Sequence, residues 1–382
     1  MSRARERQKR RIEQRKARDA MSGRNKKRTR SHLAPAQSDL PEINLNFLRP
    51  VLLLLSSGLF MAFMIILVGL FAGDEPVFVP NALWLDSSWT YQSHDDEAVQ
   101  DLVNHLRDYQ ITILYAKVSE LNFDATWTGL PQGRNQFDEV RETVRAFAAQ
   151  LKSAAPDIQL YGVLSIRADL DADGYRLDDP VILERTAQFA SQVVHSYGYD
   201  GVMLVIEPVW DGDTYYLDMI RAVRESIGDQ KLLAVAVPPD WTPLVSDVPI
   251  TDLIAPNTVW SQEYKQRVML TLIDQLVVQA YNSYLTTQSD YAAWVAYQTQ
   301  AYGQAVIDLQ QISLQILIGV PAYESIPPAH DANIETITAA LIGIKQGESN
   351  LTAPVINGIA IYAEWGMTET QWQSFKSGWL EK

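Results

Sequence analysis

The chain has 382 residues, a formal net charge of −14 and no cysteine, so disulfide bonds and a cysteine nucleophile are both excluded. A domain of this length can bury a sufficient core without such cross-links. The charge is divided sharply: residues 1–50 carry 15 basic and 5 acidic side chains, residues 51–72 carry none, and residues 73–382 have a net charge of −24. So acidic a C-terminal part argues against nucleic acid as its partner.

Residues 51–72 form an uncharged, mostly apolar run of 22 residues. As a helix this run would be ~33 Å long at ~1.5 Å per residue, which is enough to cross a bilayer. Phe71-Ala72-Gly73-Asp74 matches a signal-peptide cleavage site poorly, which favours an uncleaved anchor. We therefore expect a single-pass membrane protein, attached through residues 51–72. A basic, disordered tail (1–50) would lie in the cytoplasm, and a stem (73–80) and a folded domain (81–382) would lie outside.

Apolar, strand-like runs alternate with amphipathic, helix-like segments over the rest of the chain. Eight runs are typical of strands: Ala82–Asp86, Ile111–Ala116, Ile158–Ile166, Gly201–Glu207, Leu232–Val237, Leu276–Tyr281, Leu314–Val320 and Gly358–Tyr362. The segments between them are typical of helices: Glu97–Tyr109, Phe137–Ala154, Asp179–Tyr197, Thr214–Ile227, Glu263–Leu272, Tyr291–Leu309 and Asn333–Gln346. This alternation predicts an α/β fold with a parallel sheet, and eight units favour a closed (β/α)8 TIM barrel. An open doubly wound sheet is the alternative, but its glycine-rich phosphate turn is missing after the first strand.

The fourth predicted strand, Gly201–Glu207, ends on a carboxylate. This apolar run is too short for a helix and too apolar for an exposed strand, so we expect a buried strand in a parallel sheet. Barrels of this class place their chemistry at the C-terminal ends of the strands. Glu207 is therefore a candidate catalytic residue. The alternative is a polar side chain that has simply reached the end of its strand.

Five segments, in the correct order, resemble glycoside hydrolase family 18, the chitinase-type barrels. Asp200, Gly201 and Glu207 match the family's D-G-x-D-x-D-x-E signature on the fourth strand. The other four segments are Leu164–Ala168, similar to S-x-G-G, Val278–Asn282, similar to M-x-Y-D/N, Gly319–Tyr323, similar to G-x-P-x-Y, and Gly358–Tyr362, similar to the family's eighth strand. They cover nearly all of residues 80–370, and the resemblance implies a TIM barrel with a glycosidase-type site.

The chain departs from the family signature at its two middle aspartates, which are Met203 and Val205 here. In the family, the aspartate two positions before the glutamate orients the substrate's N-acetyl group, which is the internal nucleophile. Val205 can neither accept that hydrogen bond nor supply that charge, and this puts hydrolysis in doubt. An apolar neighbour is expected to raise the pKa of Glu207 by desolvation, which suits a general acid. Arg167 stands where the family has a glycine.

The resemblance implies a glycoside hydrolase-like protein, without a cofactor, that acts on or binds cell-wall or N-acetylglucosamine-containing glycans, either chitin-like or peptidoglycan-like. Glu207 is the expected general acid/base, Tyr281 would hold a substrate carbonyl or acetamido oxygen, and Asn282 would add a hydrogen bond. We expect further substrate contacts, several from rings that suit the apolar faces of sugars, at Trp84, Asp86, Trp241, Gln279, Tyr323, Tyr362 and Trp365.

In an alternative mechanism, a second carboxylate acts as the nucleophile or base in place of the substrate's own N-acetyl group. Such carboxyl pairs lie roughly 5–5.5 Å apart in retaining glycosidases and ~6.5–9.5 Å apart in inverting ones. Asp86, Asp240, Glu324 and Glu364 lie at or just past predicted strand ends. Glu324 and Glu364 are the better candidates, because the seventh and eighth strands can face the fourth across the barrel mouth. The alternative function is a catalytically inactive, chitinase-like module that binds a glycan or a protein.

No metal site is expected. The acidic segment 169–174 resembles the start of a calcium loop, but Pro180 occupies the twelfth position, where glutamate is needed. The five histidines lack metal-ligand spacing. Only 35 residues, 321–355, separate the last two predicted strands, so we expect an open groove rather than the deep groove that a large insertion there would build.

Overall fold

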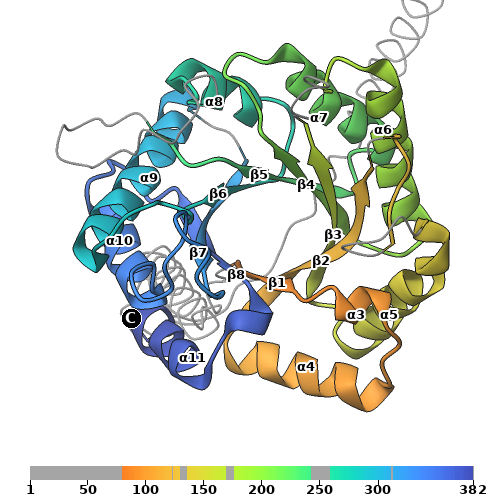
Figure 1. The fold of residues 1–382 in the computed structure, drawn as a ribbon, viewed down its shortest axis with the longest axis horizontal. Helices are drawn as coiled ribbons and strands as arrows, with labels where there is room; N and C mark the ends of the chain where they lie inside the picture. Colours follow the sequence, from red (N-terminus) through yellow and green to blue (C-terminus); the bar gives the residue numbers. More distant parts are fainter. Residues whose placement is uncertain are drawn as a thin grey trace, which may run out of the picture. The chain divides into compact units, whose positions relative to one another are not determined.

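The structure is a computed structural model that describes residues 80–122, 124–129, 136–168, 176–241, 259–310 and 313–381. It confirms the predicted TIM barrel: eight parallel strands follow one another in chain order around a closed ring, which Figure 1 shows end-on. The first strand pairs with both the second and the eighth, so the ring has no free edge. This closure excludes the open doubly wound sheet.

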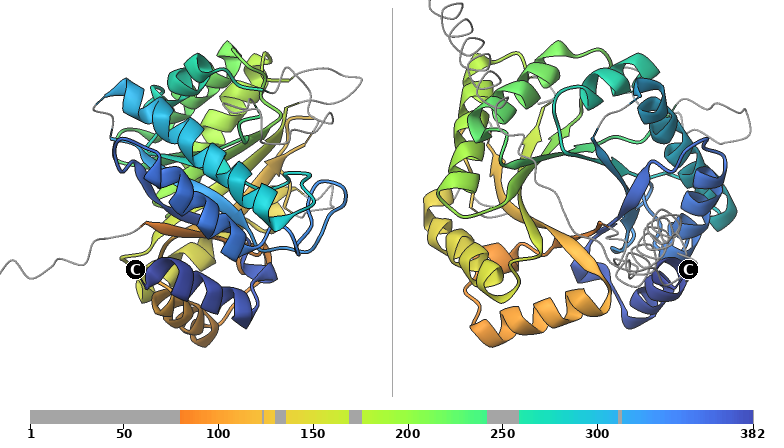
Figure 2. Two further views of the ribbon diagram at one scale, coloured as in Figure 1. Left: turned by 90° about the vertical axis from the view of Figure 1, so that its left-hand side faces the viewer. Right: turned by 180° about the vertical axis from the view of Figure 1, so that it is seen from behind.

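Each predicted strand corresponds to an observed one. The strands are β1 (Asn81–Leu85), β2 (Ile111–Leu121), β3 (Gln159–Arg167), β4 (Gly201–Glu207), β5 (Leu232–Val237), β6 (Gln275–Gln279), β7 (Gln315–Pro321) and β8 (Ile356–Tyr362). Helices surround the ring on the outside, as the views in Figure 2 show. They are α3 (Ser88–Tyr91), α4 (Asp96–Asp108), α5 (Arg141–Ala154), α6 (Pro180–His195), α7 (Thr214–Ile227), α8 (Gln262–Met269), α9 (Gln288–Leu309), α10 (Ile337–Ser349) and α11 (Glu369–Phe375).

Several predicted ends differ from the observed ones for local reasons. The sixth strand was expected to reach Tyr281, but β6 ends at Gln279, because the chain turns through left-handed backbone at Asn282 (φ 58°) and Tyr284 (φ 61°). The helix α8 ends before Leu272, which also has a positive φ. The helix α11 was not predicted, although a capping box formed by Thr368 and Gln371 marks its start.

In the part of the chain that the structure describes, no helix is long and apolar enough to span a membrane. The expected membrane span at 51–72, the basic tail at 1–50 and the expected stem up to residue 79 lie outside the described residues. The calcium-like segment 169–174 also lies outside them.

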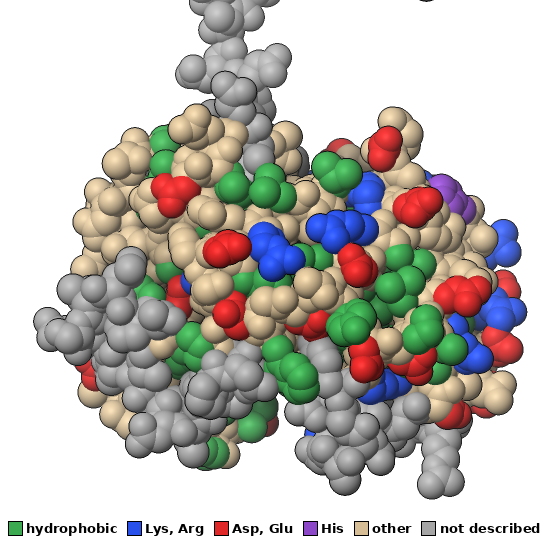
Figure 3. Space-filling view, turned by 90° about the horizontal axis from the view of Figure 1, so that it is seen from above, with side chains coloured by type: hydrophobic (Ala, Val, Ile, Leu, Met, Phe, Trp, Pro, Cys, Tyr) green, Lys and Arg blue, Asp and Glu red, His purple; other side chains and the backbone are tan. Residues whose placement is uncertain are grey.

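Two hydrophobic layers stabilise the barrel. The inner layer fills the ring with side chains such as Tyr115, Tyr161, Met203 and Leu317, which alternate along the strands with outward-facing residues. The outer layer lies between the strands and the apolar faces of the helices. The face of the molecule in Figure 3 carries charged side chains of both signs. A filled interior confines any ligand to an end of the barrel.

The first two residues of the family-like signature serve the barrel's packing. The Asp200 carboxylate accepts hydrogen bonds from Lys152 Nζ and from the Leu160 N–H, both at 2.8 Å, at the N-terminal end of β4. A Cβ on Gly201 would stand 2.4 Å from the backbone oxygen of Leu232, so only glycine allows β4 and β5 to approach this closely. Asp200 and Gly201 therefore set the base of β4, at the opposite end of the strand from Glu207.

Replacing Gly201 by alanine should destabilise the domain by about 1–3 kcal/mol, the usual cost of overpacking, because the new methyl group meets backbone that cannot move aside. Chemical denaturation of the full chain measures the effect. The control is Gly378→Ala, whose methyl group meets only the end of the flexible Leu341 side chain, at 2.8 Å. Equal stability of the two variants would contradict the packing role of Gly201.

Candidate active site

A cavity of about 1030 Å³ opens at the C-terminal ends of the strands. Its wall brings together residues that lie up to 282 positions apart in the sequence, from Trp84 to Gly366. Eleven of the predicted site residues contribute to this wall, namely Trp84, Asp86, Glu207, Trp241, Gln279, Tyr281, Asn282, Tyr323, Glu324, Tyr362 and Trp365. Glu207 and Tyr281 thus face the same cavity, at the end of the barrel where this fold class places its chemistry.

Glu207 is the last residue of β4, and its carboxyl group is open to the cavity. Although the residue is exposed to the cavity, the protein atoms packed around its carboxyl group partly desolvate it. This desolvation raises the pKa of Glu207 above the usual glutamate value, and a hydrogen bond with the Gln279 side chain partly opposes the rise. A raised pKa keeps the carboxyl protonated to higher pH, which is the form a general acid needs.

The floor of the cavity beneath Glu207 is largely apolar. Val205 lines the cavity, and Met203 is fully buried in the inner layer below it. Both positions of the family's aspartates thus point into the barrel, but only Val205 lines the cavity, so it is this substitution that removes charge from the cavity wall. Ser165, which pairs with Val205 across β3 and β4, contributes a hydroxyl to the same wall.

Aromatic rings form one side of the cavity. The rings of Tyr281 and Tyr362 stack at 5.3 Å with an angle of 16° between their planes. Tyr323 stands nearly perpendicular to both, at 6.1 Å and 5.5 Å. Trp84 and Trp365 make edge contacts with Tyr362 at 5.5 Å and 5.6 Å. Such packed rings offer flat apolar surfaces together with phenol groups that can hydrogen-bond.

The phenol of Tyr281 is a hydrogen-bond donor at any ordinary pH. Burial raises its pKa well above the usual value, and the neighbouring charge of Glu207 raises it further. Its ring fits against β7 because residue 319 is glycine. A Cβ there would stand 3.3 Å from Cε1 of Tyr281 and 2.8 Å from the Val278 backbone oxygen.

The candidate second carboxylates occupy different environments. The Asp86 side chain accepts the Ser88 N–H at 2.8 Å, and the Asp86 N–H donates to Glu364 Oε2 at 3.3 Å. Glu364 is not part of the cavity wall that the described residues form. Asp240 is buried in an ion pair with Lys265 and does not line the wall that the described residues form either. Glu324 is exposed at the rim of the cavity.

One residue of the wall that sequence reasoning missed is Lys117, whose ammonium group lies 3.2 Å from Glu120. The second strand was expected to end at Ala116, whereas β2 continues to Leu121. The alternation of the strand could have found it, because Ile113 and Tyr115 face the interior and Lys117 follows at the same spacing. Within the described ranges, no group of three or more acidic or histidine side chains could hold a metal ion.

Replacing Gly319 by alanine should displace the Tyr281 ring and lower stability by about 1–3 kcal/mol through overpacking. The control is Gly358→Ala, whose Cβ would meet the Pro80 backbone oxygen at 2.5 Å, near the start of β1. Denaturation and a crystal structure of each variant measure the two effects. A Tyr281 ring that stays in place in the Gly319→Ala structure would refute the proposed fit.

Comparisons with known proteins support the fold. No protein-family model and no curated protein matches the sequence. Among solved structures, the chain is similar to a class V chitinase from Pseudomonas fluorescens, at 13% identity over 78% of this chain and 99% of that one, with a TM-score of 0.50. It is similar to the spore cortex-lytic enzyme SleL from Bacillus cereus at 13% identity, over 78% and 74% of the two chains, with a TM-score of 0.50.

A family GH18 chitinase from Cycas revoluta, solved in complex with allosamidin, is similar at 11% identity over 78% of this chain and 99% of that chain, again with a TM-score of 0.50. At such low identities the likeness concerns the fold alone. It confirms the prediction of a chitinase-like barrel that the five sequence segments suggested.

Proposed function

We propose that the cavity binds an N-acetylated glycan and that Glu207 acts as the general acid/base in its hydrolysis. The observation that carries this proposal is the position of Glu207: a carboxyl group whose pKa is raised by desolvation shares one cavity with a wall of tyrosine and tryptophan rings. A glycosidase needs this combination, because the acid must protonate a leaving oxygen while the rings hold the flat faces of the sugars.

The proposed reaction begins when the protonated Glu207 carboxyl donates its proton to the glycosidic oxygen. The acetamido oxygen of the substrate attacks the anomeric carbon as the bond to the leaving sugar breaks. Tyr281 donates a hydrogen bond to the acetamido oxygen and orients it. The Glu207 carboxylate then removes a proton from water, which opens the cyclic intermediate and restores the acetamido group.

The fold likeness supports glycans as the ligand class, because the similar proteins are named as chitinases and a spore cortex-lytic enzyme. Chitin-like and peptidoglycan-like strands both carry N-acetyl groups. We further propose that residues 51–72 anchor the chain in a membrane, with the basic tail in the cytoplasm and the barrel outside. The distribution of charge along the sequence supports this arrangement.

A second candidate function is glycan binding without cleavage. The specific observation in its favour is the apolar floor, where Val205 and Met203 replace the two aspartates of the family signature. Without an acidic group there, the positive charge of the cyclic intermediate lacks a partner directly below it. The aromatic wall would still bind sugars in this case.

Glu207→Gln should lower kcat on chitin tetramer or peptidoglycan fragments by at least about 100-fold while preserving glycan binding, because general acid catalysis typically contributes ~10²–10⁴-fold. Product release and calorimetry with the full chain measure the two quantities. Undiminished hydrolysis by the variant would exclude Glu207 as the acid. Binding without any cleavage by the wild-type protein would favour the second candidate function.

Stability should also depend on pH through Glu207. Its folded-state pKa is raised, so its contribution is fully present below the unfolded-state value (~4.3) and is lost as the pH rises through the folded-state pKa. Glu207→Gln lacks this loss, so its Tm should exceed that of the wild type at neutral pH and approach it near pH ~4. Thermal unfolding across this range measures the difference. A Tm advantage that grows on acidification would contradict the assigned shift.

A further inference from the structure

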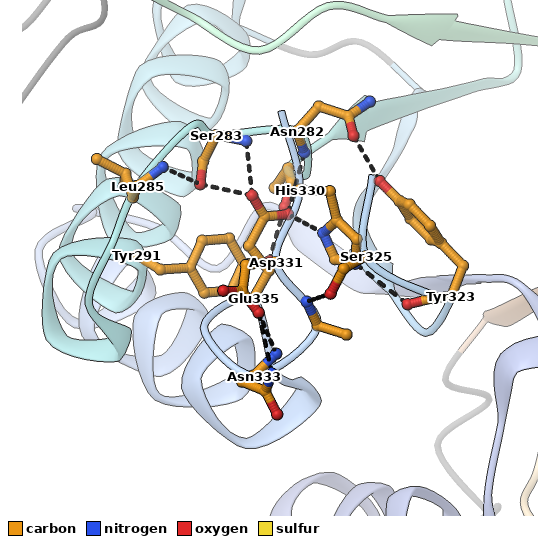
Figure 4. A network of polar contacts seen from close by, with 12 residues as sticks. Asn282, Ser283, Leu285, Tyr291, Tyr323, Ser325, His330, Asp331, Asn333 and Glu335 are labelled. Atoms are coloured by element: carbon orange, nitrogen blue, oxygen red, sulfur yellow. Dashed lines mark hydrogen bonds and ion pairs between the residues drawn. The ribbon is translucent and has the colours of Figure 1, made fainter. Parts of the chain in front are cut away.

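A buried polar network lies behind the cavity wall, where the segments that follow β6 and β7 meet (Figure 4). Its central residues are Glu335 and His330, which are each only 2% exposed. Both come from the segment between β7 and α10. Neither of them is part of the cavity wall formed by the described residues. A buried ionisable pair of this kind is costly unless its hydrogen bonds are satisfied, so its partners are informative.

Glu335 uses both carboxylate oxygens to hold the segment after β6. Its Oε1 accepts the Ser283 N–H and the Ser283 hydroxyl, both at 2.7 Å. Its Oε2 accepts the Asn282 N–H at 3.0 Å and lies 2.7 Å from His330 Nδ1. The carboxylate therefore fixes the backbone of two consecutive residues at the point where Asn282 adopts its left-handed conformation.

His330 joins this carboxylate to the segment after β7. Its Nε2 lies 3.2 Å from the backbone oxygen of Tyr323, and its ring lies 4.0 Å from the Tyr323 ring. The Tyr323 carbonyl can only accept, and so can the Glu335 carboxylate when it is ionised. The imidazole therefore makes both bonds only when both of its nitrogens carry protons.

The two segments also meet at the cavity itself. The Tyr323 hydroxyl donates to Asn282 Oδ1 at 2.6 Å, and both side chains line the cavity. Burial, and then the charge of Glu335, raise the pKa of Tyr323, so its phenol remains a donor. The same two causes raise the pKa of Tyr291, which donates to the Ala280 backbone oxygen on the other side of Glu335. Tyr323 and Tyr291, whose pKa values the Glu335 charge raises, thus each have a hydrogen-bonding partner.

We infer that Glu335 and His330 are positioning residues, which hold Asn282 and Tyr323 in the orientation that the glycan site needs. The backbone groups they bind belong to the two residues whose side chains meet at the cavity wall, and this distinguishes the pair from an ordinary core contact. The inference rests on the proposed function for its ligand, whereas the coupling of the two segments can be tested without one.

The test compares Glu335→Gln and His330→Ala with the full-length wild type. The control is Asp274→Asn, another carboxylate that accepts a backbone N–H, from Leu233 at 2.7 Å, but at the N-terminal end of the barrel. We expect the Kd for chitin tetramer to rise about tenfold in both test variants, which corresponds to ~1.4 kcal/mol. It should stay unchanged in the control, even where the loss of Tm is similar.

Hydrogen exchange on the free protein provides a readout that needs no ligand. His330→Ala should speed amide exchange at residues 282–283, although Glu335 is still present. Glu335→Gln should speed amide exchange in the segment that follows Tyr323. The control should change neither segment. If one test variant fails to fold, the other still decides the question, since each should affect both segments.

A double variant separates positioning from general destabilisation. Tyr323→Phe removes the hydrogen bond between Tyr323 and Asn282 at the cavity. If His330 and Tyr323 act through one chain of contacts, the double variant should lose less binding free energy than the sum of the two single variants. Unchanged exchange in both segments, or wild-type affinity in Glu335→Gln, would overturn the inference. If the wild type binds no chitin tetramer, the proposed function fails. The exchange experiment then decides the coupling by itself: accelerated exchange in the variants supports it, and unchanged exchange overturns it.

Discussion

Closure of the sheet between β1 and β8 is the constraint on which the site depends. The pairs Ala82–Ala360 and Leu83–Ile361 join the first strand of the sheet to the last one and bring Trp84 against Tyr362. Because all strands are parallel, closure gathers their C-terminal ends into one ring, and the filled interior leaves that ring as the place for a cavity. The aromatic wall is thus a consequence of topology, since its rings come from strands at opposite ends of the chain.

Buried charges fix several of the segments that follow the strands. Glu335 holds the turn after β6, Asp240 pairs with Lys265 just after β5, and Arg176 donates to the backbone oxygens of Arg167 and Asn122. Glu207 differs from them, because it shares a hydrogen bond with the neutral amide of Gln279 and has no cationic side chain among the causes that set its pKa. Desolvation is therefore not offset by an opposite charge, and it raises the pKa of this carboxyl group.

Sequence reasoning predicted residues at strand ends that share one cavity, and it did not identify residues whose positions depend on contacts across the fold. Glu207 and Tyr281 could be placed by strand order alone. Asp240 was one of four possible second carboxylates, but its burial against Lys265 follows from the packing of α8, which strand patterns do not reveal. Glu335 was not predicted, because it follows no strand directly and the backbone N–H groups that it binds lie more than 50 positions earlier in the chain.

The alternation of apolar runs and amphipathic segments, together with eight repeats, determined the fold class and the end of the barrel where a site belongs. Comparison with the family signature on β4 also indicated, without any structure, that Met203 and Val205 stand where the family has aspartates. Only the tertiary structure decided which polar groups share the cavity. The physical reason is that desolvation and hydrogen bonding depend on neighbours from distant strands, whereas periodicity depends on adjacent residues along one element.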